Sequence, residues 1–205
     1  FWLKSISSDL DVSEKFEYSL DLPSEIKRID RLYIETVSGG RVSAEVKFSI
    51  KDSPVENIYV ENLVITLPDV IMLSGEDVVD NRIEISGRQL PARETGEVLL
   101  SKFDITGLKN LPVSDGKIVI DDAVSFNGKV RTIDGELIDG LNGDVVITPV
   151  VSVPDIKAVK FEGAIDVDLN DYIDTPSVDL SDLTDKLSEI SLGLSDPSIS
   201  VTVSN

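Results

Sequence analysis

Apolar and polar residues alternate along much of the chain, and the longest alternation runs from Ala158 to Leu169. One set of alternate residues is apolar apart from a glycine, and it consists of Val159, Phe161, Gly163, Ile165, Val167 and Leu169. Every residue between them is alanine or charged. Because successive side chains of a strand point to opposite faces, the stretch predicts a long strand with one buried face and one solvated, acidic face. We interpret it as the best-defined core strand of the protein.

A second clean alternation lies in Arg41–Lys51, where every second residue from Val42 to Ile50 is apolar. The dipeptide Gly39-Gly40 separates this segment from another segment of strand character, Ile29–Val37. Glycine accepts the positive φ angles that tight turns require. The two segments therefore predict a β-hairpin.

The same pattern predicts further strands elsewhere in the chain. They cover Lys15–Leu22, Ile58–Leu67, Ile83–Gly87, Val98–Ile105, Lys117–Val130, Val145–Val153 and Ile199–Val203. Polar or proline-containing segments predict loops at Ser5–Asp11, Gly75–Asn81, Arg88–Gly96 and Gly107–Asp115. Within the second of these strands the apolar parity shifts near Asn62, which predicts a β-bulge.

Glycine dipeptides and one proline add detail to the second half of the chain. Turns are predicted at Asp134-Gly135, Asp139-Gly140 and Asn142-Gly143. Asn127-Gly128 predicts either a hairpin turn or a bulge. Pro149 interrupts an apolar run, and because proline cannot donate a ladder hydrogen bond, it predicts an edge position or a bend.

One segment has the periodicity of a helix. Leu183, Leu187 and Ile190 form an apolar stripe in Ser181–Ile190, and Ser181 is suited to cap its start. Adjacent strands joined by turns favour antiparallel pairing. We therefore predict a mainly β protein, an antiparallel β-sandwich or long curved sheet with one short C-terminal helix. We expect one elongated domain over residues 1–205, with 148–155 as the place where a subdomain boundary would fall.

Composition excludes several classes of function. The chain has 38 acidic and 19 basic residues and a formal net charge of −19, which opposes binding to nucleic acids and to anionic membrane surfaces. It contains no Cys and no His, so thiol nucleophiles, imidazole bases, disulfides and the usual zinc ligands are excluded. No apolar run approaches the roughly 18 residues of a membrane-spanning segment. We expect no enzymatic activity and no cofactor.

An acidic motif at the end of the longest alternation is the one candidate metal site. Asp166, Asp168, Asn170 and Asp171 follow the order of the first ligands of an EF-hand-type calcium loop. The match fails at the sixth position, where Asp171 replaces the turn glycine, and at the twelfth, where Ser177 replaces the closing glutamate. The alternative interpretation is a solvated strand face that runs into a polar loop.

Three aromatic residues are candidate ligand-binding positions. Tyr33 and Tyr59 have the outward parity of their strands, and Trp2 lies near the first residue. Flat rings on the face of a sheet can stack against sugars. The alternative interpretation is an ordinary cross-strand pair on a solvated face.

Several segments carry a resemblance to a known group of proteins. They are NLVITLPDVIML, VLLSKFDITGL, NGKVRT, PDIKAVKFEGAIDVDL and VDLSDL, together with the closing LGLSDPSISVTVSN. In their strand pattern they resemble uncharacterised exported β-rich proteins of Bacteroidetes, many of which are lipoproteins. The closing Asp196-Pro197 strand start is also similar to that of LEA14-like β-sandwiches. The resemblance implies export and residence in the periplasm or on the outer-membrane surface, and it implies no site residues.

These observations favour a non-enzymatic exported or cell-surface module with a structural or binding role. The first alternative is a glycan- or protein-binding, adhesin-like domain, which predicts exposed aromatics that converge on one patch. The second is a carrier of lipids or other apolar ligands, which predicts a cavity inside the fold. The partner is then an unknown protein or glycan, and a lipid anchor would have to lie on a Cys upstream of Phe1.

Overall fold

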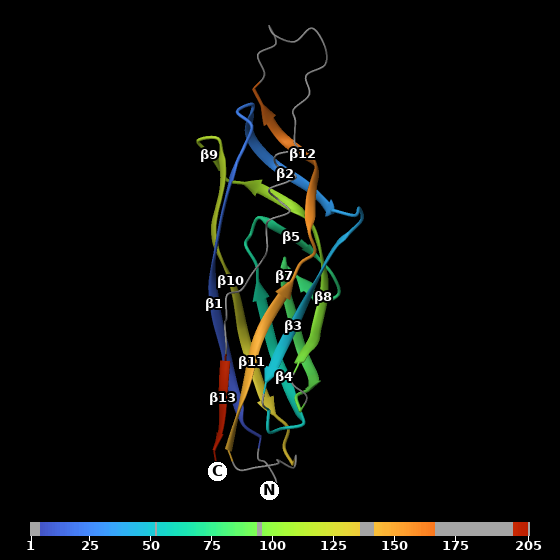
Figure 1. The fold of residues 1–205 in the computed structure, drawn as a ribbon, viewed down its shortest axis with the longest axis vertical. Helices are drawn as coiled ribbons and strands as arrows, with labels where there is room; N and C mark the ends of the chain where they lie inside the picture. Colours follow the sequence, from blue (N-terminus) through green and yellow to red (C-terminus); the bar gives the residue numbers. More distant parts are fainter. Residues whose placement is uncertain (1–4, 52, 94–95, 136–141, 167–198, 205) are drawn as a thin grey trace.

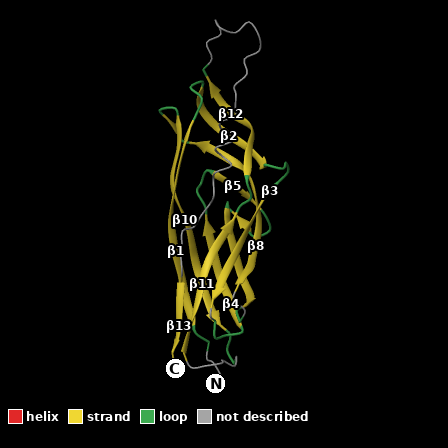
Figure 2. Cartoon of the chain, viewed as in Figure 1, coloured by secondary structure: helices red, strands yellow, loops and turns green. Residues whose placement is uncertain are grey.

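The computed structural model describes residues 5–51, 53–93, 96–135, 142–166 and 199–204. Within these residues the chain forms two antiparallel sheets packed as a sandwich that is elongated along its strands (Figures 1 and 2). This confirms the predicted fold class and selects the sandwich over a single curved sheet. The described residues contain no helix, and the helix predicted at Ser181–Ile190 lies outside them.

The first sheet has six strands in the order β1-β10-β4-β7-β6, with β9 beside β10. Their bounds are Ser7–Asp21 for β1, Lys117–Thr132 for β10, Asn57–Thr66 for β4, Arg82–Pro91 for β7, Val78–Val79 for β6 and Val113–Ser114 for β9. The two longest of these strands, β1 and β10, pair along their whole length.

The second sheet has seven strands in the order β12-β2-β8-β3-β11-β13, with β5 beside β8. Their bounds are Ile156–Ile165 for β12, Ile26–Thr36 for β2, Gly96–Leu111 for β8, Val42–Lys51 for β3, Asn142–Ser152 for β11, Ile199–Ser204 for β13 and Ile71–Ser74 for β5. Pro149 pairs with Phe48 of β3 beyond the part of β11 that pairs with β13. The proline therefore has a described partner strand on one side only, as an edge position requires.

The core lies between the sheets and follows the alternation of the sequence. The inward positions of β3 are buried from Val42 to Ile50, as predicted. Phe48 of the second sheet and Phe126 of the first are among the largest fully buried side chains. The buried apolar side chains of the two sheets thus pack against each other, which is the main source of stability in a sandwich.

The predicted bulge near Asn62 is present. Asn62 of β4 pairs with Lys129 of β10, and Val60 pairs with Val130, so that Glu61 is an extra residue on β4. At this place a side chain on Gly128 would lie 2.2 Å from the carbonyl oxygen of Asn62. The dipeptide Asn127-Gly128 therefore lies in a strand next to a bulge and forms no hairpin turn.

Several predicted loops are strands in the structure. Ser5–Asp11 mostly belongs to β1, Arg88–Gly96 continues β7 as far as Pro91, and most of Gly107–Asp115 belongs to β8 and β9. Asn142-Gly143, predicted as a turn, begins β11. Polar side chains and turn-forming residues are compatible with a strand when a neighbouring strand supplies backbone hydrogen bonds, and this pairing cannot be seen in a local pattern.

The prediction for Ala158–Leu169 assigned the wrong residues to the buried and exposed faces. The strand β12 ends at Ile165 and pairs with β2 through three irregularities in register. Val159 and Ile165, expected inside, are each 44% exposed, whereas Ala158, expected outside, is buried. A bulge shifts the parity of every residue after it, so alternation in the sequence does not become alternation of faces. The strand is an outer strand of its sheet within the described chain.

Candidate functional site

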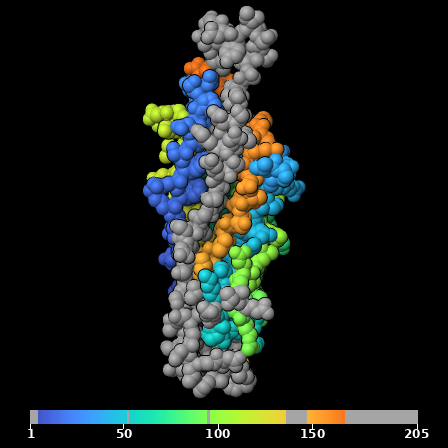
Figure 3. Space-filling view, in the orientation of Figure 1, coloured from blue at the N-terminus to red at the C-terminus, as the bar shows by residue number. Residues whose placement is uncertain are grey.

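The hairpin predicted at Gly39-Gly40 has a tight turn but divergent strands. Gly39 donates to the carbonyl of Thr36, and both glycines have positive φ angles, 88° and 103°. Beyond the turn, however, β2 and β3 pair with different parts of β8. Residues 42–50 of β3 pair with 96–105 of β8, whereas β2 pairs with 108–111. The turn projects from the side of the molecule (blue at the right in Figure 3).

Both strands use the same edge of β8, because β5 occupies the other edge. Ile105 pairs with Val42 of β3 and with Leu73 of β5, and Leu108 pairs with Leu32 of β2 and with Ile71 of β5. The change of partner falls at Thr106 and Gly107. A Cβ on Gly107 would lie 2.7 Å from the carbonyl oxygen of Leu32, and its φ is +149°. Glycine thus permits the close approach of the backbones of β2 and β8.

This divergence opens a groove between β2 and β3. Its volume is about 530 Å³, and it is lined by Ile34, Glu35, Gly40, Arg41, Val42, Ser74, Asp104, Ile105 and Thr106. On β2 and on β8 it contacts both inward and outward residues: Ile34 with Glu35, and Ile105 with its neighbours. A hollow that contacts both parities lies along the edges of these strands, where they separate. We call it the inter-strand groove.

The walls of the inter-strand groove are polar and its floor is apolar. Arg41 lies 3.8 Å from a carboxylate oxygen of Asp104, and Ser43 donates to the same carboxylate at 2.5 Å. Thr106 donates to the carbonyl of Met72. The buried residues Ile34 and Ile105 form part of the floor. This arrangement suits a ligand with an apolar part and a polar or charged part.

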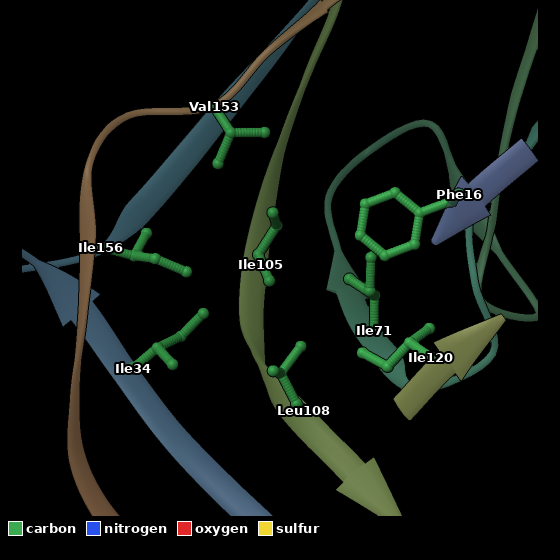
Figure 4. A pocket seen from close by; sticks show the side chains of 8 residues that line it. All are labelled: Phe16, Ile34, Ile71, Ile105, Leu108, Ile120, Val153 and Ile156. Carbon is green, nitrogen blue, oxygen red and sulfur yellow. The ribbon is translucent and has the colours of Figure 1, made fainter. Parts of the chain in front are cut away.

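Beneath the floor lies a small apolar cavity between the sheets. Ile34 and Ile105 line it as well as the groove, so the two hollows meet at these side chains. Figure 4 shows Phe16, Ile120 and Ile71 on one side of the cavity and the remaining lining side chains on the other. The complete lining is Phe16, Ile34, Ile71, Ile105, Leu108, Ile120, Val153 and Ile156.

The cavity is small for a ligand site. Its volume is about 40 Å³, which exceeds the roughly 10–15 Å³ needed for one water molecule. Pockets for drug-sized ligands have volumes of about 300–1,000 Å³. The inter-strand groove falls within that range, and the cavity does not.

Tyr33 lies on the outer face of the second sheet, in a cluster of charged side chains. Its hydroxyl donates to Glu162 at 2.8 Å, and Lys160 donates to the same carboxylate at 2.9 Å. The guanidinium carbon of Arg31 and the Nζ of Lys160 lie 4.7 and 4.8 Å from the centre of its ring. Hydrogen bonds from Lys160 and Tyr33 lower the pKa of Glu162, and the bond to Glu162 raises the pKa of Lys160.

Tyr59 lies on the outer face of the first sheet, against Arg131. The guanidinium carbon is 4.4 Å from the ring centre, and Arg131 also forms an ion pair with Glu61. The two tyrosines therefore belong to opposite faces of the sandwich and do not form one patch. Cation–π contacts occupy ring surface that a sugar would need. Trp2, the third predicted aromatic, lies outside the described residues.

The predicted calcium motif falls mostly outside the described chain. Asp166 is exposed, and its backbone N–H donates to the carbonyl of Glu25. Asp168, Asn170 and Asp171 are not among the described residues. Within residues that are described, no three acidic side chains gather in a way that could hold a metal ion.

The inter-strand groove was not predicted from the sequence. Its walls come from ordinary strand residues, and the hollow depends on where β2 and β3 pair with β8. The one local signal is Gly107, which follows the apolar-polar run of β8 and permits the close approach of β2. A glycine in a strand marks a bulge or a close approach of another backbone.

Comparisons with known proteins give no further assignment. The chain matches no protein-family model, and it has no significant match to a curated protein or to a solved structure. Over the described residues, there is no helix with the length and apolar character needed to cross a membrane.

Proposed function

We propose that the chain is a non-enzymatic binding module of an exported protein, and that its ligand lies in the inter-strand groove. The observation that carries this proposal is the break in the second sheet, where β8 changes partner from β3 to β2. An interrupted sheet loses backbone hydrogen bonds and packing, and the resulting hollow has the volume of a ligand site. The absence of His and Cys from the sequence supports a role in binding over catalysis.

The lining favours a small amphipathic ligand. Its apolar part would contact Ile34, Val42 and Ile105, and its polar part would lie beside Arg41 and Asp104. A carrier that encloses a whole lipid chain is less well supported, since the cavity between the sheets measures only about 40 Å³. The acidic, Cys-free composition agrees with a periplasmic or outer-membrane location and with the absence of nucleic-acid partners.

A glycan- or protein-binding, adhesin-like role is the second candidate. The elongated sandwich and the charged cluster around Tyr33 favour it. Protein is the better-supported partner, because cations cover ring surface on both candidate tyrosines. The free aromatic platform that stacks on sugars is therefore not supplied by Tyr33 or Tyr59.

Titration calorimetry with 8-anilinonaphthalene-1-sulfonate tests the groove, because this probe combines apolar rings with one anionic group. The variant Thr106→Trp places a large side chain in the groove. Ser86→Trp places the same side chain at an exposed position of β7 in the other sheet. We expect binding at one site by the wild type and by Ser86→Trp, and at least tenfold weaker binding by Thr106→Trp. Melting curves identify a variant that has lost its fold. Equal binding by the two variants, or no binding by the wild type, would contradict the proposal.

A further inference from the structure

The outer face of the second sheet carries a group of cations that the groove does not use. We define the cation patch as Arg31, Lys109 and Lys160, with Tyr33 and Glu162 among them. Arg31 and Lys160 both contact the ring of Tyr33. In a protein with a net charge of −19, three cations and one carboxylate in one place reverse the local sign of charge.

Two of these cations face each other across neighbouring strands. Arg31 of β2 pairs directly with Lys109 of β8. Side chains at directly opposed positions leave the sheet on the same face with Cβ atoms about 4.5–5.5 Å apart, and like charges there are destabilising. The sequence therefore places an unfavourable pair at this site, in a chain where acidic residues are twice as numerous as basic ones.

The one carboxylate of the patch is already engaged. Glu162 accepts hydrogen bonds from Lys160 and from Tyr33. Within the described chain, Arg31 and Lys109 form no ion pair with any carboxylate within 4.0 Å. The Nε of Arg31 is buried without a hydrogen-bond partner among the described residues, and its guanidinium lies against the ring of Tyr33. Glu162 pairs directly with Arg31 across β12 and β2, so this one carboxylate offsets charge on both Arg31 and Lys160 while Lys109 has no described carboxylate partner.

We infer that the cation patch is a docking surface for an acidic segment of a partner protein. A carboxylate that reaches the space between Arg31 and Lys109 would contact both cations and remove their repulsion. Lys160, one strand further along, would attract a second carboxylate of the same segment. This surface is separate from the inter-strand groove, and the inference does not depend on the ligand proposed there.

Fluorescence anisotropy with a labelled deca-glutamate peptide tests this inference, and a deca-glutamine peptide is its uncharged control. At 0.1 M salt the screening length is about 10 Å, which limits repulsion from the rest of this acidic protein. The double variant Arg31→Gln/Lys109→Gln removes the opposed pair. Arg82→Gln, at an exposed position of β7 in the first sheet, removes a cation outside the patch.

We expect the wild type and Arg82→Gln to bind deca-glutamate alike and deca-glutamine not at all. The double variant should bind at least tenfold more weakly with a melting temperature no lower than that of the wild type, and 0.5 M salt should weaken binding by the wild type. Absence of wild-type binding, or an equal loss with Arg82→Gln, would overturn the inference. A sulfated polysaccharide that binds more tightly than the peptide at equal charge, and depends on the same two residues, would overturn the protein partner in favour of a glycan.

Discussion

Arg88 of the first sheet and Ser101 of the second donate hydrogen bonds to the same carboxylate, that of Asp77. Arg88 contacts both carboxylate oxygens at 2.8 Å, and Ser101 contacts one of them at 2.5 Å. Arg88 also donates to the carbonyl of Leu100. Asp77 and its two partners therefore connect the sheets with polar bonds at the margin of an apolar core.

Replacement of Asp77 by alanine should destabilise the fold by about 2 kcal/mol or more, because it leaves a partly buried guanidinium and a buried hydroxyl without their acceptor. Urea unfolding measures this change. Glu56→Ala is the matched control, since its ion pair with Arg93 is exposed, and such pairs contribute about 0–1 kcal/mol. Equal losses for the two variants would contradict the role assigned to Asp77.

Gly107→Ala should destabilise the protein by about 2 kcal/mol or more, because the new Cβ would lie 2.7 Å from a backbone oxygen of β2. Gly96→Ala, in the same strand, meets no atom within 4 Å and should change stability by less than about 0.5 kcal/mol. Thermal unfolding of the two variants compares them directly. A neutral Gly107→Ala would mean that β2 does not approach β8 as closely as described.

Lys109→Glu should stabilise the protein by about 0.2–1 kcal/mol, because it turns a like-charge pair with Arg31 into an ion pair. Lys117→Glu should instead destabilise the protein. It replaces the 3.1 Å ion pair between Lys117 and Asp21 with two opposed carboxylates. Chemical denaturation gives both values, and a destabilising Lys109→Glu would argue against the described register of β2 and β8.

The hydrogen bonds of Glu45 should make the stability of the fold depend on pH. Hydrogen bonds from Lys102 and Lys47 lower the pKa of Glu45 in the folded state. A lowered folded pKa gives a stabilising contribution that is present above the ordinary pKa of 4.5 and is lost as the pH falls through the folded value. Melting temperatures of the wild type and Glu45→Gln should therefore differ at pH 6 and converge as the pH falls through the folded-state pKa of Glu45. Lys102 is exposed and Glu45 is 33% exposed, so 0.5 M salt should reduce the difference at pH 6. A difference that does not shrink as the pH is lowered would exclude this cause.

The alternation of side chains was sufficient to predict the fold class and several strands. From Val42 to Ile50 the irregularity in register leaves its extra residue, Leu100, on β8, so parity in the sequence of β3 equals parity in the fold. The slip near Asn62 was also visible, because the apolar residues themselves change parity there. In β12, by contrast, there are three irregularities in register, so a residue's parity in the sequence does not tell which face of the sheet it occupies. Val159, which was predicted to be buried, is exposed.

The candidate site could not be predicted from the sequence, for a different reason. Tyr33 and Tyr59 were correctly given outward parity, but the cations that cover their rings come from other strands as well as their own. The inter-strand groove follows from which part of β8 pairs with β2 and which with β3. Pairing between distant segments decides both features, and local patterns carry little information on it.

The pairing of β1 with β10 has a consequence for how the protein folds. Ser7 pairs with Arg131 and Asp21 with Lys117, so the first strand of the chain finds its described partner only after most of the sequence has been synthesised. The outer strand β12 pairs with β2 over a similar separation. Such topologies fold in milliseconds to seconds, since distant segments must meet before contacts compensate for lost chain entropy. We therefore expect that a nascent chain cannot complete its first sheet until the residues of β10 have left the ribosome.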